Sequence, residues 1–493
     1  MERLGRLYMP LIVLFFLNRV DAQDIPGYNM SNYAGVAGID LQPACIADMR
    51  YKFDLTIVGA GIDFNNNYIS AYGKYIRDGT FFQNYIGNFQ DHFLNESTTP
   101  VNKEVGLNAY VQLPSFAITI NRSISVAFTC RLRTMLNIDN VSPQLAHLMY
   151  TDLNTTDPLN QTYFNNTLNN NTFSINQMSW WEYGIDYAQV LYNQGNHLFK
   201  IGGRVKLEAG LEAAYLYASK FNYNWKNNDT LSLYNTVVQQ GHTQTLVNDL
   251  SGNSNIGNAL GNVSASSLAL DIGVVYEWRP DFYELGYQYR RGSGSDRRDI
   301  SKYKIRLGAS ILDLGVMKFT KGDQAYNFTA NTTNWNVSAL HFGPNKIQSL
   351  DTIIANKFGN SDTKNKFLFY LPTTFSFQVD YNIYKDLYLN FTSNTSPQWL
   401  NVTSQVHTLS YYVVTPRWDQ KWFGVFLPMG INGYGQPTFG ASVRLGPLIV
   451  GSSNAFNLLF ASQIYGINAY AALKVPIMFN NPRKRKKESC PAF

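Results

Sequence analysis

The sequence is poor in the residues that build disulfide frameworks and metal centres. Its 493 residues include three cysteines, Cys45, Cys130 and Cys490, which is an odd number with no close pair. The six histidines are scattered, and neither an HExxH nor a CxxC pattern occurs. These absences exclude a small domain held together by disulfides, and they give no support for a metal site.

Long hydrophobic runs are also absent beyond the start of the chain. Leu7–Leu17 is an apolar stretch that follows Arg3 and Arg6 and precedes small residues at 20–22. This order is typical of a cleaved secretory signal peptide, which we expect at residues 1–22. No run of about 18 apolar residues follows it, so membrane-spanning helices are excluded. The sequence therefore predicts an exported protein.

Surplus charge is concentrated in the last residues of the chain. The formal net charge is +6, and the run RKRKKE at 483–488 alone contributes +4. The rest of the chain is close to neutral and has no basic footprint, so no nucleic-acid partner is predicted. We expect residues 480–493 to form a short basic tail in the periplasm, attracted to anionic lipid.

Motifs for catalysis and cofactor binding are missing as well. Gly59 and Gly61 fit the start of a dinucleotide-binding turn, but Phe64 stands where the third glycine is required. An asparagine cluster at 65–67 then occupies the place where the helix should begin. Neither a Gly-x-Ser-x-Gly elbow nor a Gly-Lys-Ser/Thr phosphate loop occurs. We therefore predict no enzyme, no cofactor and no metal, and we interpret 53–64 as a β-strand.

The sequence is rich instead in aromatic residues, 15% of the chain, and in segments that alternate apolar and polar residues. The segments are 52–64, 123–136, 197–217, 302–312, 374–383 and 467–477. The predicted apolar faces include Phe53, Leu55, Ile57 and Gly59 in the first; Ile201, Val205, Leu207, Leu211 and Tyr215 in the third; and Tyr303, Ile305 and Leu307 in the fourth. Period two over about ten residues indicates a strand with one apolar face.

Strand length decides between the two architectures that such a pattern allows. The segments run for about 10 to 20 residues, whereas strands of soluble sandwiches usually have about five or six. Long tilted strands cross a bilayer, and a sheet in hydrocarbon must close on itself because open edges find no partners there. We therefore predict an all-β fold, a transmembrane antiparallel β-barrel of about 14 strands (range 12–16), over residues 50–479.

The connections between the segments alternate in length. Tight links are expected at 121–122, 193–196, 280–281, 384–386 and 416–419. Long polar stretches lie at roughly 65–105, 139–178, 219–266, 320–372 and 394–406. Short periplasmic turns and long outer loops are typical of outer-membrane barrels. The predicted location is the outer membrane of a Gram-negative bacterium, with its lipid as a partner.

Charged residues on the polar faces are the candidates for function. Those predicted to face the lumen are Arg131, Arg133, Lys200, Arg204, Lys206, Glu208, Glu212, Asp271, Glu277, Lys304, Arg306, Asp380, Arg444 and Lys474. One interpretation is a path or pocket whose cations meet a carboxylate headgroup. The other is a satisfied network of ion pairs that fills the barrel or holds a segment inside it.

Three stretches resemble known families. LQPACIADMRYKFDLTIVGAGIDF (41–64) is similar to the start of long-chain fatty-acid transporter-like barrels, where Asn-Pro-Ala-x-x-Ala precedes the first strand, although Gln42 replaces the asparagine. Together with 252–278 and 441–454, it resembles a family of Bacteroidota outer-membrane barrels. The resemblance implies that residues 23–49 lie in the lumen as a hatch.

Two functions remain open from the sequence. The first, implied by the same resemblance, is passive transport of hydrophobic or amphipathic small molecules, with an apolar small-molecule ligand as partner. The second is a structural or assembly barrel that acts as a partner of a secretion or cell-envelope complex, with a protein bound to its loops or tail. A cavity and a movable N-terminal segment would favour the first, and a filled lumen would favour the second.

Overall fold

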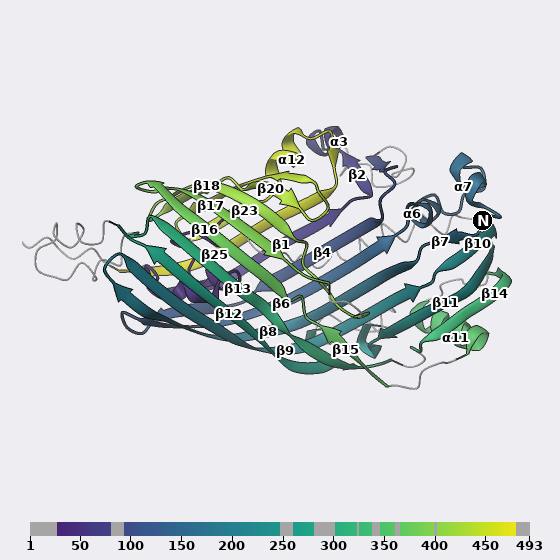
Figure 1. Ribbon diagram of the computed structural model, residues 1–493, viewed down its shortest axis with the longest axis horizontal. Helices are drawn as coiled ribbons and strands as arrows, with labels where there is room; N and C mark the ends of the chain where they lie inside the picture. The colour runs from purple at the N-terminus through teal and green to yellow at the C-terminus, as the bar shows by residue number, and fades with distance from the viewer. Residues whose placement is uncertain are drawn as a thin grey trace, which may run out of the picture.

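The computed structural model describes residues 27–79, 93–246, 260–280, 301–322, 325–337, 346–359, 365–398 and 402–479. Its strands form a closed antiparallel barrel of 14 strands, because the last strand pairs with the first (Figure 1). Among these residues no helix is long and apolar enough to cross a bilayer. The predicted fold class and strand number are confirmed. The expected signal peptide and basic tail lie outside the described residues.

Fourteen wall strands follow one another around the barrel, four of them interrupted by a short break. In chain order they are β1 (Tyr51–Asn66), β4 with β5 (Lys103–Gln112, Ser115–Thr119), β6 (Ile124–Val141), β8 (Thr172–Gln194), β9 (His197–Ser219), β12 (Ala265–Trp278), β13 (Ile305–Thr320), β15 with β16 (Lys366–Tyr370, Thr374–Tyr384), β17 (Leu387–Thr395), β18 (Tyr411–Asp419), β19 with β20 (Phe423–Phe426, Met429–Asn432), β21 with β22 (Pro437–Phe439, Ala441–Leu445), β23 (Leu448–Ser452) and β25 (Gly466–Met478).

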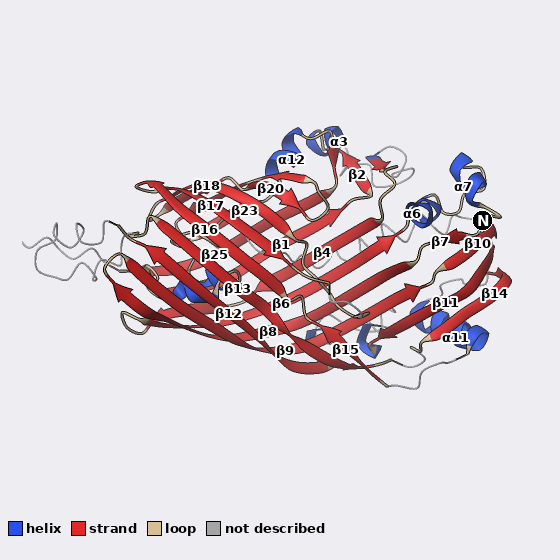
Figure 2. Cartoon of the chain, viewed as in Figure 1, coloured by secondary structure: helices blue, strands red, loops and turns tan. Residues whose placement is uncertain are grey.

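The remaining strands and most helices belong to the long connections, which gather at one end of the barrel (Figure 2). They are β2 (Ile69–Tyr72), α3 (Gly73–Arg77), β3 (Leu94–Glu96), α6 (Pro143–Tyr150), α7 (Pro158–Tyr163), β7 (Leu168–Asn169), β10 (Asn222–Asn227), β11 (Thr230–His242), β14 (Phe328–Asn336), α11 (Lys346–Phe358), α12 (Ala455–Phe460) and β24 (Gln463–Ile464). We call this the loop end and the opposite one the turn end.

The turn end has the tight links that the sequence predicts at 121–122, 193–196 and 384–386. The link predicted at 280–281 is only partly described, since Asp281 lies outside the described residues. The link predicted at 416–419 is wrong, because these residues end β18 and the turn follows at 420–422. Pro416 is tolerated in this strand because of the direction of its backbone groups. Its carbonyl accepts from Leu427 at the break between β19 and β20, and the N–H that proline lacks would point to the same side, where the ladder is interrupted.

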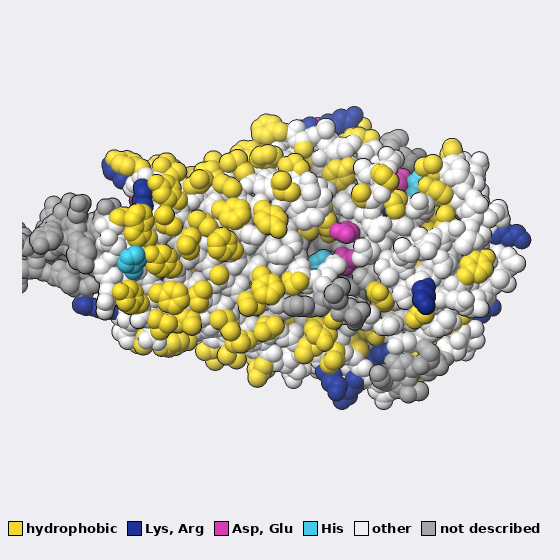
Figure 3. Space-filling view, in the orientation of Figure 1, with side chains coloured by type: hydrophobic (Ala, Val, Ile, Leu, Met, Phe, Trp, Pro, Cys, Tyr) yellow, Lys and Arg dark blue, Asp and Glu magenta, His cyan; other side chains and the backbone are white. Residues whose placement is uncertain are grey.

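The outer surface of the barrel wall is apolar, as the period-two pattern predicts. Ile185 and Val205 are 70% and 53% exposed, and each neighbours a buried charged residue in sequence; Leu268 is 68% exposed beside the buried Ala269. Figure 3 shows hydrophobic side chains spread over much of the barrel surface, with few charged ones among them. Such a surface is stable only against hydrocarbon, so the wall is a membrane-spanning one.

Two β-bulges change the faces that strict alternation predicts. The pairing of β1 with β25 shifts between Thr56 and Val58, so Gly59 faces the lumen, not the side of Phe53. The pairing of β8 with β9 shifts at Leu211, so Tyr215 packs inward on the apolar cluster beside Trp180. Both inversions follow from one extra residue in a strand, which reverses every later side chain.

Candidate functional site

Residues 27–50, which we call the plug, lie inside the barrel near the turn end. They include α2 (Val36–Ile39) and η2 (Pro43–Ile46) and lead directly into β1. Apolar plug residues pack on small inward side chains of the wall, Ala117, Ala127 and Ala188. Alanine at these positions leaves the space that the plug occupies. Each fully buried valine or isoleucine of the plug contributes about 1.5–3 kcal/mol relative to water.

Three glycines on neighbouring strands form a cradle for the plug. They are Gly202 of β9, Gly273 of β12 and Gly308 of β13, and Gly202 pairs directly with Gly273. A Cβ added to Gly202 would lie 2.5 Å from the backbone nitrogen of Ala44, and one on Gly273 would lie 1.8 Å from Oε1 of Gln42. Any larger residue would therefore push η2 away from the wall.

Gln42 fastens the plug to this cradle through its side-chain amide. Its Nε2 donates to the carbonyls of Val274 and Ala309, at 3.1 Å each, and to Oε1 of Gln378, also at 3.1 Å. Its Oε1 accepts from the N–H of Ala44 at 3.3 Å, which caps η2. The side chain that replaces the expected asparagine thus joins the plug to β12, β13 and β16.

Ion pairs hold the plug at two further places. Asp40 lies 3.0 Å from Arg131 and 2.9 Å from Arg204. Asp48 lies 3.1 Å from Arg279. All of these side chains are largely buried, so their interactions are stronger than those of exposed pairs.

The plug backbone and its hydroxyls bind other wall charges. The carbonyl of Met30 accepts from Arg306, and the carbonyls of Tyr33 and Ala34 accept from Lys474 at 3.1 Å. Asp419 of β18 accepts from Oγ of Ser31 at 3.0 Å and from the N–H of Asn32 at 2.8 Å. The plug therefore contacts charged groups on several sides of the lumen.

Each wall cation that binds the plug also has a carboxylate on the wall itself. The pairs are Arg131 with Glu182 at 2.7 Å, Arg204 with Asp271 at 2.6 Å, Arg279 with Glu277 at 2.5 Å, Arg306 with Asp380 at 3.1 Å and Lys474 with Asp54 at 3.0 Å. Removal of the plug would thus leave each of these buried cations with an anionic partner. At these five positions the wall charges are paired within the wall itself, a property that we call the self-sufficiency of the wall charges.

A layer midway along the lumen contains two more carboxylates than cations. The cations are Arg131, Arg133, Arg204 and Lys206, and the carboxylates are Asp40, Glu182, Asp186, Glu208, Asp271 and Asp313. Oxygens of Glu182, Glu208 and Asp313 lie within 4.8 Å of one another, a spacing that suits a metal ion. The Lys206 ammonium already lies 3.5 Å from Glu182 and 3.8 Å from Glu208, so a cation of the chain holds this cluster.

Most of the charged residues predicted for the lumen belong to these contacts. Arg131, Arg133, Lys200, Arg204, Lys206, Glu208, Asp271, Glu277, Arg306, Asp380, Arg444 and Lys474 all make inward ion pairs. Two predicted lumen residues lie elsewhere. Glu212 follows the bulge at Leu211 and pairs with Ser179, on the face opposite to Glu208. Lys304 directly precedes β13, and its backbone bonds to Trp278 and Asn382; its ammonium donates to the carbonyl of Ile383 and lies over the ring of Tyr381 on the outer rim.

Several site residues were missed by the sequence analysis. Tyr303 was assigned to the apolar face, but its hydroxyl donates to Asp380 and lies 2.8 Å from Oδ1 of Asn32 in the plug. Arg417 and Asp419 were assigned to a turn, yet Arg417 lies 2.6 Å from Asp380. The alternation in YYVVTPRWD (411–419) could have revealed them, but Pro416 suggested a turn instead. Nothing in the sequence marks Asp40 as a partner of residues in β6 and β9.

An apolar cluster fills the lumen on the loop side of the charged layer. It contains Met135, Met178, Trp180, Ala213, Tyr215, Ala265, Ala269, Met317, Phe319, Phe367, Phe369, Leu371 and Val406. The Arg133 guanidinium lies 4.9 Å from the ring centre of Trp180 and joins the two regions. A cavity of about 20 Å³ lies beside them and is lined by Tyr110, Arg131 and Arg204 among others.

The closed barrel, its apolar exterior and its charged lumen define a transmembrane β-barrel of the kind found in the outer membrane of Gram-negative bacteria. Residues 43–453 match a family described as a family of unknown function, DUF5723, and the chain belongs to this family. No curated protein sequence matches the chain significantly.

Several solved outer-membrane barrels are similar in structure. The toluene transporter TodX of Pseudomonas putida has 9% identity over 92% of this chain and 99% of that chain, with a TM-score of 0.33. The toluene transporter TbuX of Ralstonia pickettii has 8% identity over 90% and 94%, with a TM-score of 0.29. A FadL homologue of Pseudomonas aeruginosa has 9% identity over 91% and 98%, with a TM-score of 0.24. Similarity at these scores does not indicate what this chain binds.

Proposed function

We propose that this protein is a gated outer-membrane channel for hydrophobic or amphipathic small molecules, and that the plug is its gate. The observation that carries the proposal is the self-sufficiency of the wall charges. A buried cation that loses its only partner costs about 3–5 kcal/mol. Here each wall cation that binds the plug keeps a wall carboxylate, so the plug can leave without that cost.

Movement of the plug is required for passage. Two cavities inside the described lumen have volumes of about 60 and 20 Å³. One water needs about 10–15 Å³ of such space, so each has room only for a few waters or a small oxyanion. A channel for larger molecules must therefore displace residues 27–50, which are covalently attached to the wall only through Arg50 and β1.

The sequence of surfaces along the lumen supports an amphipathic ligand. A molecule that enters from the loop end would first meet the aromatic cluster around Phe319 and Phe367, and then the guanidiniums of Arg131 and Arg133. The rings would bind an apolar body, and the guanidiniums would bind an anionic group. Neither surface alone would select for both parts of such a molecule.

A disulfide that locks the plug tests the proposal. The Cβ of a residue at 27 would lie 3.5 Å from the Cβ of Phe426, within the range for a disulfide, and 2.8 Å from Cγ2 of Thr415, so Thr415→Ser is included to make room for it. The variant Gly27→Cys with Phe426→Cys and Thr415→Ser, in a background where the native cysteines are serines, fixes the plug at both ends, with some strain because φ is 88° at residue 27. Its flux is measured in proteoliposomes with an aromatic sulfonate dye as the amphipathic probe. We expect flux under reducing conditions and none after oxidation; equal flux in both states would overturn the proposal.

The closed lumen favours a second candidate, a structural or assembly barrel with a protein partner. In that case the plug is a permanent part of the core, and its contacts serve stability. Native mass spectrometry of the barrel, extracted gently from its own membrane, separates the candidates. A small apolar ligand near one copy per barrel supports the channel. A bare lumen with a tightly bound second protein supports the assembly role.

A further inference from the structure

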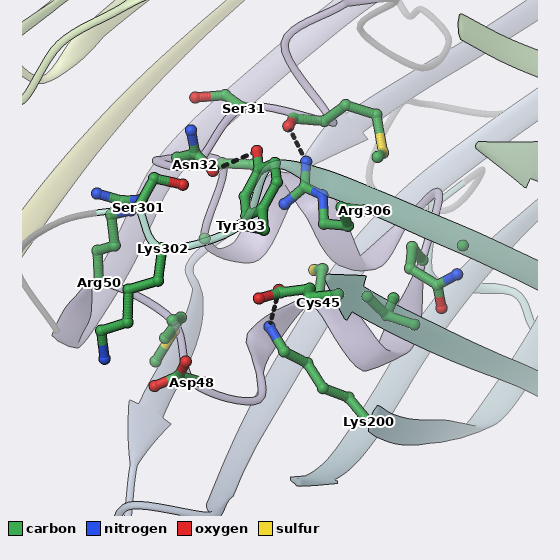
Figure 4. A pocket seen from close by; sticks show the side chains of 18 of the residues that line it. Ser31, Asn32, Cys45, Asp48, Arg50, Lys200, Ser301, Lys302, Tyr303 and Arg306 are labelled. Carbon is green, nitrogen blue, oxygen red and sulfur yellow. Dashed lines mark hydrogen bonds and ion pairs between the residues drawn. The ribbon is translucent and has the colours of Figure 1, made fainter. Parts of the chain in front are cut away.

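A cavity of about 60 Å³ lies between the plug and the wall at the turn end (Figure 4). The plug contributes Asn32, Asp48 and Arg50 to its lining, and the wall contributes residues at 301–306. One water needs about 10–15 Å³ of such space, so this cavity has room for a small oxyanion. The cavity is distinct from the layer around Glu182 and from the apolar cluster near the loops.

Positive charge predominates around this cavity. Its cationic lining residues are Arg50, Lys200, Arg279, Lys302 and Arg306, and its carboxylates are Asp48 and Glu277. Glu277 is shared by Lys200 at 2.7 Å and Arg279 at 2.5 Å, and Arg279 also binds Asp48. The carboxylate that binds Arg306, Asp380, is shared with Arg417. The lining carboxylates therefore leave a surplus of positive charge.

Several hydrogen-bond donors beside the cavity have no partner. Nδ2 of Asn32, Nε of Arg306 and Oγ of Ser301 are buried and make no hydrogen bond to the residues that the structure describes. The Lys302 ammonium makes no hydrogen bond or ion pair to any described residue, and burial lowers its pKa although Asp48 nearby opposes this. Buried donors without partners cost about 1–3 kcal/mol each, so their presence around one cavity needs an explanation.

We propose that this cavity is a binding site for a phosphate group, either free or as the headgroup of a phosphorylated molecule. A phosphate oxygen can accept from several donors at once, and its two negative charges match the surplus of cations. Asn32 belongs to the plug, whereas Ser301, Lys302 and Arg306 belong to the wall. A bound phosphate would join the two and hold the plug in place. The site does not depend on the proposed channel function, since it exists in the closed barrel.

Lys302→Gln is the variant that tests the site, because it removes an ammonium with no partner among the described residues. Lys304→Gln is the matched control: it lies two residues further along, on the outer rim over Tyr381. Binding of inorganic phosphate to the purified full-length protein is measured by calorimetry, with chloride at equal ionic strength as reference. Melting temperatures are measured with and without phosphate.

We expect phosphate to bind wild type and to raise its melting temperature. Lys302→Gln should weaken phosphate binding by at least about tenfold, because one charge-assisted hydrogen bond is lost. Lys304→Gln should bind phosphate within about twofold of wild type. Without phosphate, Lys302→Gln should melt at the same temperature as wild type or higher. No phosphate binding, equal losses in both variants, or equal binding of acetate would overturn the assignment.

The source of the phosphate group is distinguished with nanodiscs. Binding of inorganic phosphate in detergent identifies a site for the free ion. A melting shift that requires phosphatidic acid in the nanodisc, and that Lys302→Gln abolishes, identifies a lipid headgroup. Both results support the phosphate site and differ only in where the phosphate comes from.

Discussion

Replacement of Asp40 by asparagine tests whether the plug can open while the barrel stays folded. The carboxylate lies 3.0 Å from Arg131 and 2.9 Å from Arg204, and an amide keeps its size but removes its charge. A hydrogen bond to a charged group contributes about 1.5–3 kcal/mol. Because both guanidiniums keep wall carboxylates, we expect Asp40→Asn to destabilise the closed plug by about 2 kcal/mol. The open population should then rise roughly 30-fold.

The native thiol of Cys45 in η2 reports this opening. Burial raises the pKa of this thiol to about 12, although Arg306 and Lys200 lie near it. A cysteine in water has a pKa of about 8.5, and only the thiolate reacts with maleimides. At pH 7.5 the thiol of the closed plug should therefore react more slowly than that of a released plug, by roughly two to three orders of magnitude. With Cys130 and Cys490 replaced by serine, the labelling rate follows the open fraction.

The expected result is a labelling rate that rises roughly 30-fold in Asp40→Asn, with an unchanged melting temperature of the barrel. Two results would refute the reasoning. An unchanged labelling rate would mean that the ion pairs of Asp40 do not hold the plug. A parallel loss of barrel stability would mean that plug and wall unfold together, so that the plug is part of the core and no gate.

Three further perturbations have expected outcomes. Glu182→Gln should destabilise the barrel by about 1.5–3 kcal/mol in urea unfolding, because it removes charged hydrogen bonds from Arg131 and Arg133, which keep Asp40 and Asp313 as partners; a loss below 1 kcal/mol would contradict this. Gly202→Val should increase Cys45 labelling, since its Cβ would lie 2.5 Å from the plug backbone, whereas at the neighbouring Gly203 the nearest atom is 3.6 Å away, so Gly203→Val should have no such effect. At the loop end, burial opposes the charge of His147, but hydrogen bonds to Glu96 and Asp157 raise its pKa above the usual value. The melting difference between wild type and His147→Gln should thus be fully present below about pH 6.5 and disappear as the pH rises through the raised pKa; a difference that grows with pH would exclude this.

The strands could be predicted because every second residue of a wall strand faces the hydrocarbon of the membrane and must be apolar. Hydrocarbon on one side and a charged lumen on the other impose period two over a whole strand, as in β16, where Phe375 and Phe377 face lipid and Asp380 faces the lumen. A single inserted residue carries no signal of its own. The bulges at Ile57 and Leu211 therefore inverted the faces predicted for Gly59, Glu212 and Tyr215.

The site could be predicted only in part, for a similar reason. The charged residues of the lumen were visible strand by strand, but their partners lie in distant parts of the chain. Asp40 and Arg204 are 164 residues apart, and Lys474 and Asp54 are 420 apart. The glycine cradle could not be predicted for the same reason. A single glycine in a strand has several possible roles, and only the strand register places Gly202 beside Gly273, where together they make room for η2.

The charge balance of the middle layer explains why Asp40 is the sensitive point of the plug. Without the plug, this layer already contains more wall carboxylates than cations, since Glu182, Asp186, Glu208, Asp271 and Asp313 face three arginines and Lys206. Asp40 is the carboxylate that the plug adds to this layer. Its pairs with Arg131 and Arg204 compete with those to Glu182 and Asp271. Because Arg131 and Arg204 can bind either Asp40 or their wall carboxylates, their bonds to Asp40 can form and break. Such reversible bonds are expected of a gate and not of a permanent part of the core.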